Sequence, residues 1–254
     1  MLFRRRNGSA SLDETWIELK LDDIGLAIAV RRSARARRVT LRVSAASGEV
    51  ILTAPPHVPY ATAVAFVRSQ EDWIRARLRR LPDRVDFVPG ACIPVRGAPH
   101  LIVHRPEARG TCWIETDAGG QALICVAGEA PHVARRVADH LKRLARADLI
   151  VAVARHAAVL DVTTGPLTVR DTVSRWGSCA RNGALSFSWR LILAPPEILD
   201  YLAAHEVAHR LEMNHGPRFW AHVERLYPER RRAEAWLKTQ GAGLHRFGPG
   251  PVRT

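Results

Sequence analysis

Residues 195–215, PPEILDYLAAHEVAHRLEMNH, carry the strongest structural signal in the chain. Two prolines followed by a glutamate are typical of the first turn of a helix, where a missing N–H is tolerated and a negative charge is favourable. Four residues then recur at helical spacing and are expected on one inward face: Ile198, Leu202, His205 and His209. The segment therefore predicts a helix whose two histidines point toward the core.

The two histidines of this helix have the spacing of a metal-binding pair. His205 and His209 lie four residues apart, so both imidazoles leave the same face and can bind one ion. Glu206 lies about 100° around the axis from His205, which is a poor position for a ligand but a suitable one for reaching a water on the ion. The pattern predicts a metal-dependent hydrolase in which Glu206 is the catalytic base.

A catalytic zinc site takes three protein ligands and leaves one position open. His215 is our prediction for the third, because Asn214, Gly216 and Pro217 can end the helix and turn the chain back. The prediction is one Zn²⁺ per chain, although three histidines also accept other divalent metals. Four nearby residues are alternative third ligands: Glu224, Glu229, Glu234 and His222.

The alternative is two core histidines beside a surface glutamate. A HExxH motif arises by chance in a chain of this composition with a probability of roughly 2%, and a further histidine at the required spacing lowers this to about 0.1%. The motif also lies on a helix with a start signal and is followed by a turn. These features favour the metal site.

Composition describes an ordinary globular protein, with 47% hydrophobic and 25% charged residues among 254. The longest apolar run, residues 24–30, is far shorter than the ~20 residues of a membrane span. The first 14 residues contain three arginines and no apolar stretch behind them, unlike a secretory signal. We therefore expect a cytoplasmic protein without membrane contact. Four scattered cysteines are expected to be free thiols: Cys92, Cys112, Cys125 and Cys179.

The formal net charge of +13 raises the question of a nucleic-acid partner. Of the 38 basic residues 35 are arginines, a bias that suggests codon usage more than selection for binding. The densest basic cluster lies in residues 31–42. We expect a solvated basic face there and do not favour nucleic acid as the partner. The oligomeric state is left open.

The pattern of hydrophobic residues divides the chain into two regions. Residues 15–130 alternate with a period of two and are expected to be β-rich, with one helix over 60–81. Residues 131–245 predict a long helix to about 160, a strand over 167–176, an Asn182-Gly183 hairpin, a strand over 185–193 and the HExxH helix. The two ends, 1–14 and 246–254, are expected to be disordered or mobile. No internal repeat is visible.

Four motifs together resemble the signature of the YgjP-like metallopeptidases, relatives of the SprT-like proteins and the wider zincins. They are Arg175-Trp176-Gly177-Ser178-Cys179, the segment Trp189-Arg190-Leu191-Ile192-Leu193-Ala194-Pro195, Tyr201 before His205-Glu206-x-x-His209, and Asn214-His215-x-x-x-Phe219-Trp220. The resemblance extends over roughly 30–240 and is weaker before 130. Gly216 stands where the family more often has serine.

The resemblance implies an α+β fold with a zincin-like catalytic domain, built from a HExxH helix and a β-hairpin and preceded by a β-rich region. It also implies metal on His205, His209 and His215, with Glu206 as base, and a strand over 169–176 or after Gly183 along the cleft. Arg175, Trp176 and Arg190 are candidate substrate residues, although an arginine beside a hairpin is usually solvated or paired and a tryptophan is more often core.

Three functions follow from these observations. The first is a zinc metallopeptidase acting on a peptide substrate. The second is a metal-dependent hydrolase of a nucleotide or another phosphoanhydride small molecule. The third is a nucleic-acid-associated protein with a metalloprotease-like domain, in which the arginines of residues 31–42 hold the polyanion.

Overall fold

The computed structural model describes residues 15–21, 24–44, 48–81 and 83–248. The chain divides into two compact units, Met1–Pro82 and Asp83–Thr254. This boundary lies well before the one expected at 130. The expected disorder of residues 1–14 lies outside the described residues, as does that of 249–254, whereas residues 246–248 are ordered parts of the second unit.

The first unit is a four-stranded sheet with two helices. Its strands are β1 (Thr15–Leu21), β2 (Ile24–Arg32), β3 (Thr40–Val43) and β4 (Val50–Ala54), in the order β1-β2-β4-β3. The β2–β4 pair is parallel, and the β1–β2 and β3–β4 pairs are antiparallel. The predicted alternation holds in β1 and β4, where every second described residue is buried, and in β3, where every second residue is half-buried. β2 departs from it, because Ala29 is buried as well as Ile28 and Val30.

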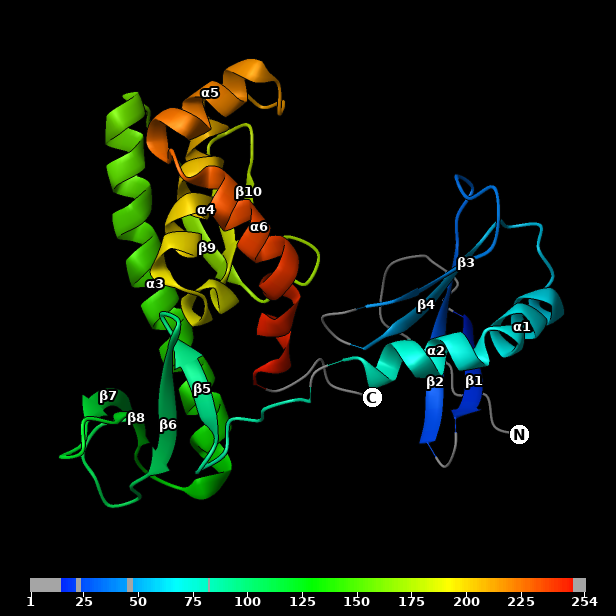
Figure 1. Ribbon diagram of the computed structural model, residues 1–254, viewed down its shortest axis with the longest axis horizontal. Helices are drawn as coiled ribbons and strands as arrows, with labels where there is room; N and C mark the ends of the chain where they lie inside the picture. Colours follow the sequence, from blue (N-terminus) through cyan, green and yellow to red (C-terminus); the bar gives the residue numbers. More distant parts are fainter. Residues whose placement is uncertain (1–14, 22–23, 45–47, 82, 249–254) are drawn as a thin grey trace. The chain divides into compact units, whose positions relative to one another are not determined.

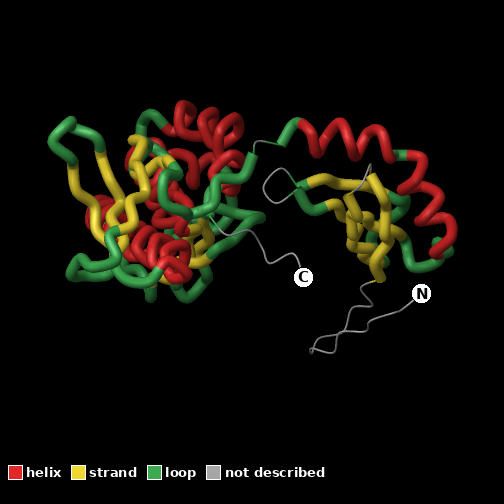
Figure 2. The backbone as a smooth tube through the Cα atoms, turned by 90° about the horizontal axis from the view of Figure 1, so that it is seen from below, coloured by secondary structure: helices red, strands yellow, loops and turns green. Residues whose placement is uncertain are grey.

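Both helices lie on one side of this sheet, as Figure 2 shows. They are α1 (Tyr60–Ser69) and α2 (Glu71–Arg79), where one continuous helix was expected. The break comes at Gln70, whose backbone leaves the helical conformation. Three helical residues, Ala63, Val67 and Ile74, close a small apolar core with the inward residues of the sheet.

The second unit begins with a sheet of the same topology. Its strands are β5 (Cys92–Val95), β6 (Ala98–His104), β7 (Cys112–Thr116) and β8 (Ala122–Val126), in the order β5-β6-β8-β7, with β6 and β8 parallel. The strand order and directions repeat those of the first sheet. The fold therefore contains a repeat that was not visible in the sequence.

Helix α3 (Val133–Leu160) explains why the boundary lies at 82 and not at 130. This 28-residue helix packs on β7 and β8 and also on α4, so the β5–β8 sheet shares one core with the rest of the second unit. Ile102 and Ile124 of the sheet and Leu141 of α3 are fully buried in that core. A segment without a core of its own cannot form a separate unit.

A small sheet precedes the HExxH helix. It consists of β9 (Leu167–Arg170), β10 (Gly177–Cys179) and β11 (Leu185–Ser188), in the order β10-β11-β9. A hairpin with its turn at Asn182-Gly183 is present, and Gly183 has the positive φ of +85° that this turn requires. Its first strand is β10, which was not predicted, whereas β9 from the expected strand over 167–176 pairs with β11 in parallel. Two expected strands are shorter than predicted, because β9 ends at Arg170 and Trp189–Leu193 form a 3₁₀ helix.

Three helices and a 3₁₀ segment complete the second unit (Figure 1). They are α4 (Pro196–Ala208), α5 (Pro217–Leu226), α6 (Arg230–Gln240) and the 3₁₀ segment Gly241–Arg246. Helix α4 is central, packed between α3, α5, α6 and β10. Within the described ranges, no helix has the length and apolar character needed to cross a membrane. All four cysteines are free.

Candidate metal centre

The HExxH residues lie at the end of α4 and just beyond it. Pro196 occupies the first turn with Glu197, as the sequence predicts, and the helix ends at Ala208 with His209 as its C-cap. Helix α5 begins at Pro217 with Gly216 as an extended N-cap. His215 therefore lies on the short connection between two helices, where the chain can turn it back toward His205.

Three histidines meet at this point. The ligand atoms of His205, His209 and His215 all lie within 4.8 Å of one another, and no other described residues group around a comparable centre. The Nε2 atoms of His205 and His215 are 3.1 Å apart. Two nitrogens bound to one tetrahedral zinc ion at about 2.05 Å would be about 3.3 Å apart. The spacing therefore fits two ligands of one ion.

A phenylalanine supports all three imidazoles. The ring of Phe219 stacks on His209 with centroids 4.5 Å apart and meets His205 and His215 edge-on at 4.9 and 4.7 Å. Phe219 is fully buried. Trp220 packs 5.8 Å from the rings of His205 and His215. The first turn of α5 thus fixes the orientation of the imidazoles by packing.

The protonation of the histidines suits metal binding. Burial, followed by the two neighbouring histidines, lowers the pKa of His205 to about 3, and burial also lowers the pKa of His209. Neutral imidazoles are the form that binds a metal. The Nδ1–H of His209 donates to the carbonyl of Glu212 at 3.0 Å, which leaves Nε2 of His209 free to coordinate. The donor set therefore fits zinc.

Glu206, which follows His205 on α4, is buried and does not lie on the surface. Its residue is only 4% exposed, and burial raises the pKa of its carboxyl to about 7, an effect that the charge of Arg175 opposes. A Cβ on Gly177 would come within 2.5 Å of the Glu206 Oε1 atom. The glycine of β10 therefore provides the space in which this carboxylate lies.

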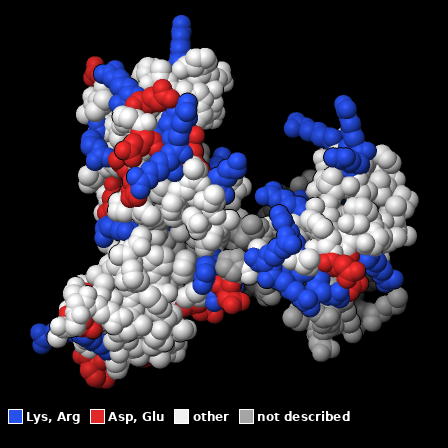
Figure 3. Space-filling model, viewed as in Figure 1, with Lys and Arg blue, Asp and Glu red and all other residues white. Residues whose placement is uncertain are grey.

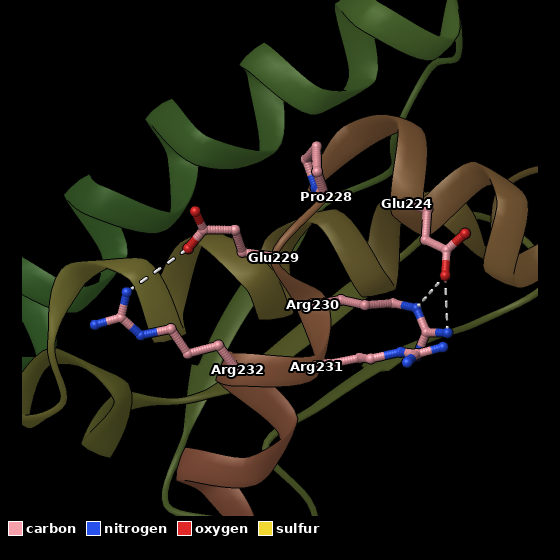
Figure 4. Close-up of a pocket in the computed structure, with 6 residues that line it drawn as sticks. All are labelled: Glu224, Pro228, Glu229, Arg230, Arg231 and Arg232. Carbon is pink, nitrogen blue, oxygen red and sulfur yellow. Dashed lines mark hydrogen bonds and ion pairs between the residues drawn. The ribbon is translucent and has the colours of Figure 1, made fainter.

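The acidic alternatives for the third ligand are paired elsewhere, as Figure 4 shows for two of them. Glu224 accepts from Arg230 at 2.9 Å, and Glu229 lies 3.8 Å from Arg232. Glu234 accepts from Arg230 and from the hydroxyl of Tyr201, both at 3.1 Å. His222 is not part of the histidine cluster either. Of the candidates for the third ligand, only His215 lies close to His205 and His209.

The three candidate substrate residues have different surroundings. Arg175 is exposed and is close enough to Glu206 to influence its pKa. Trp176 is half-buried and packs 5.0 Å from the ring of His245. The Arg190 residue is 3% exposed, and its guanidinium donates to Asp171.

Arg190 also binds the C-terminal 3₁₀ segment. Its Nη1 donates to the carbonyl of Phe247 at 2.6 Å and to that of Leu244 at 3.3 Å. The guanidinium of Arg190 is therefore buried and held by Asp171 and two backbone carbonyls. The expectation that an arginine beside a hairpin is paired describes this residue.

Sequence reasoning missed three residues that shape this site: Gly177, Phe219 as an imidazole support, and Asp171. Gly177 lay inside a recognised motif, but its partner Glu206 is 29 residues away in the sequence. Phe219 was expected only as part of a buried face. Nothing in the sequence around Asp171 marks it as the partner of a buried arginine.

A helix and turn that bring three histidines together beside a buried glutamate are typical of metal-dependent hydrolases. Residues 37–240 match the family described as YgjP-like, metallopeptidase domain, and the chain therefore belongs to the YgjP-like family. A metallopeptidase family implies a divalent metal, usually zinc, and a peptide substrate.

No curated protein matches the chain. The crystal structure of the metallopeptidase zymogen of Pyrococcus abyssi abylysin is similar over 36% of this chain and 95% of its own, with 19% identity and a TM-score of 0.33.

Proposed function

We propose that the chain is a zinc-dependent peptidase with a zincin-like catalytic domain, in which His205, His209 and His215 bind one ion and Glu206 is the general base. The observation that carries the proposal is the convergence of three imidazoles whose ligand atoms lie within 4.8 Å of one another. The family supports a metallopeptidase in general. When bound in such a site, zinc acidifies a water and polarises a carbonyl.

Glu206 has the properties that a general base requires. A carboxyl whose pKa lies near 7 can both accept and release a proton at neutral pH. We propose that its Oε1 or Oε2 atom accepts the proton of the attacking water and passes it to the leaving amine. The backbone of Gly177 and the burial of the carboxylate keep it in one place.

An extended peptide would bind along β10. This strand is at the edge of its sheet, so one side of its backbone has no neighbouring strand among the described residues. The two segments expected along the cleft from the sequence were 169–176 and the strand after Gly183. The first is a strand only as far as Arg170, in β9 at the opposite edge of the sheet, and the second, β11, is central and already paired on both sides. A substrate that adds as a strand beside Gly177 would pass next to Glu206. Arg175, exposed before β10, is the candidate for contacting it.

The test is a side-by-side assay of zinc-loaded full-length protein on casein and on nucleoside triphosphates. We expect casein cleavage, and Glu206→Gln should keep its zinc while its rate falls by two to four orders of magnitude. Glu197→Gln, an exposed change in the first turn of the same helix, is the matched control. Hydrolysis of triphosphates without cleavage of casein would replace the peptidase with a nucleotide hydrolase, and full activity of Glu206→Gln would remove Glu206 as the base.

A further inference from the structure

The first unit has a sheet face that its helices do not cover. Both helices pack on one side of the sheet, and within the described residues of this unit no element packs on the other. Antiparallel sheets often leave one face to solvent, but such faces usually carry mixed polar residues. The identity of the exposed residues on this face therefore indicates whether it is an ordinary solvated surface or a binding surface.

A row of four residues crosses the open face, one from each strand. The row begins with Trp16 on β1, passes through Ala29 and Ile51, and ends with Arg42 on β3. At about 4.8 Å per strand it spans about 14 Å. Trp16 is 49% exposed although its side chain is large and mostly apolar. A planar aromatic side chain is thus presented at one end of the row and a guanidinium at the other.

The neighbouring row adds a second arginine. Arg31 on β2 is exposed and lies beside Thr53 and Thr40. Within the described residues, neither Arg31 nor Arg42 has an acidic partner. The side chain of Arg32 points the other way and donates to the carbonyls of Pro55 and Val58.

Three more arginines lie on the loop between β2 and β3, which begins directly after Arg32. Arg35, Arg37 and Arg38 are all exposed and have no ion-pair partner within the described residues. Figure 3 views this unit from the side on which the helices lie, and basic side chains are prominent on that face as well, beside a smaller acidic patch. Glu18 lies on the same face as Trp16, two residues further along β1, in a row on the opposite side of Trp16 from the row of Arg31. Glu49 precedes β4, whose other end, Ala54, pairs with Arg32 next to the loop.

The second sheet, with the same topology, provides an internal comparison. Its corresponding face carries Leu101, Val103 and Trp113, all partly or mostly covered, and the arginine beside it, Arg105, is paired with Glu115 at 2.6 Å. The topology therefore does not require unpaired arginines or an exposed tryptophan on this face. They are specific to the first unit.

We propose that the open face of the first unit, defined as Trp16, Arg31 and Arg42 with the loop arginines Arg35, Arg37 and Arg38, binds single-stranded nucleic acid. Guanidinium groups match phosphates in geometry and charge, and an exposed indole can stack on a base whatever its sequence. The flat face has no projecting helix or ribbon that would enter a duplex groove, so an unpaired strand is the better fit. This inference does not rest on the proposed peptidase activity.

The test measures fluorescence anisotropy of a labelled 20-nucleotide oligothymidylate with the full chain at several salt concentrations. We expect a dissociation constant of about micromolar at low salt, and log affinity falling linearly with log salt. Changing Arg35, Arg37 and Arg38 together to Gln should lower the slope by about 2, because each phosphate contact on a single strand contributes about 0.7. Trp16→Ala should weaken binding by about tenfold without changing the slope.

Two controls separate this face from diffuse basic charge. Changing Arg109, Arg231 and Lys238 to Gln removes the same charge from exposed positions of the second unit, and binding should change less than twofold. Trp16→Phe should retain most of the affinity that Trp16→Ala loses, and circular dichroism checks that each variant is folded. Equal losses in the two triple variants, an unchanged affinity in Trp16→Ala, tighter binding to a 20-base-pair duplex, or no binding at low salt would each overturn the proposal.

Discussion

The carboxylate of Glu206 occupies the space that a side chain on Gly177 would need. An added Cβ would come within 2.5 Å of the Glu206 Oε1 atom and within 2.9 Å of the carboxyl carbon. Real Cβ contacts are not this short, and the carboxylate is buried, so it could not simply swing into solvent. Strand β10 and helix α4 are therefore matched in shape at the candidate catalytic residue.

Gly177→Ala should displace the carboxylate of Glu206 while leaving the residue itself unchanged, so it tests whether the position of the carboxylate matters for turnover. The methyl group pushes the carboxylate aside, and a displacement of about 1 Å can lower turnover by about a hundredfold. Zinc content should remain stoichiometric because the three atoms nearest to the new methyl all belong to Glu206 and none to a histidine. Gly243→Ala, which meets open space, is the control. Full activity in Gly177→Ala would mean that the carboxylate is not held where we propose.

Removal of the third imidazole should affect both metal and stability. His215→Ala should lose most of the bound zinc, because two protein ligands bind the ion much more weakly than three. The zinc content is measured by elemental analysis of dialysed protein. Chelation should lower the melting temperature of the wild type but not of this variant. His222→Ala, a histidine of α5 outside the cluster, should behave as wild type. Equal zinc in both variants would exclude His215 as a ligand.

The Arg190 guanidinium should stabilise the fold without taking part in substrate binding. Arg190→Met leaves the carbonyls of Leu244 and Phe247 without their donor and should lower the free energy of unfolding by about 3 kcal/mol, measured with urea. Asp171 is half-exposed and is hydrated instead, so it adds little to this cost. Under conditions where the variant is folded, its KM should be unchanged. A raised KM with normal stability would restore the substrate role.

The stability of the protein should fall in mild acid through His245. Burial, and then the charge of Arg190, lower the pKa of His245 to about 4, against an ordinary value of 6.5. Between these two values the unfolded chain is protonated at this residue and the folded chain is not. Stability therefore rises with pH across this window, by on the order of 3 kcal/mol.

A variant at residue 245 can show how much of the pH dependence of the unfolding free energy comes from His245. His245→Gln removes the titrating group, so urea unfolding between pH 4 and 6.5 should depend less on pH than in the wild type. Part of the dependence should remain, because burial also lowers the pKa values of His140, His205 and His209, which titrate in the same way in the metal-free protein. An identical pH profile in the variant and the wild type would show that His245 is not buried in its neutral form.

The site was more predictable from sequence than the architecture around it. The HExxH spacing, the helix start at Pro196 and the turn at Asn214–Pro217 are local signals, and each corresponds to a feature of the structure. The expected strand over 185–193 was half wrong, because its alternating pattern continues into a 3₁₀ helix that is buried on all sides. Periodicity predicts exposure on one side, and a segment buried all round cannot be assigned by it.

The sequence by itself determined which residues have the chemistry for a metal site, because helical spacing and turn residues act over a few positions and need no distant partner. It also determined that β strands fill the first half. Tertiary structure alone decided that Glu206 is buried against Gly177, that Arg190 binds Asp171 and the C-terminal carbonyls, and that the β5–β8 sheet shares its core with α3. These contacts join residues far apart in the chain, and burial, which sets their energies, is a property of the packed molecule.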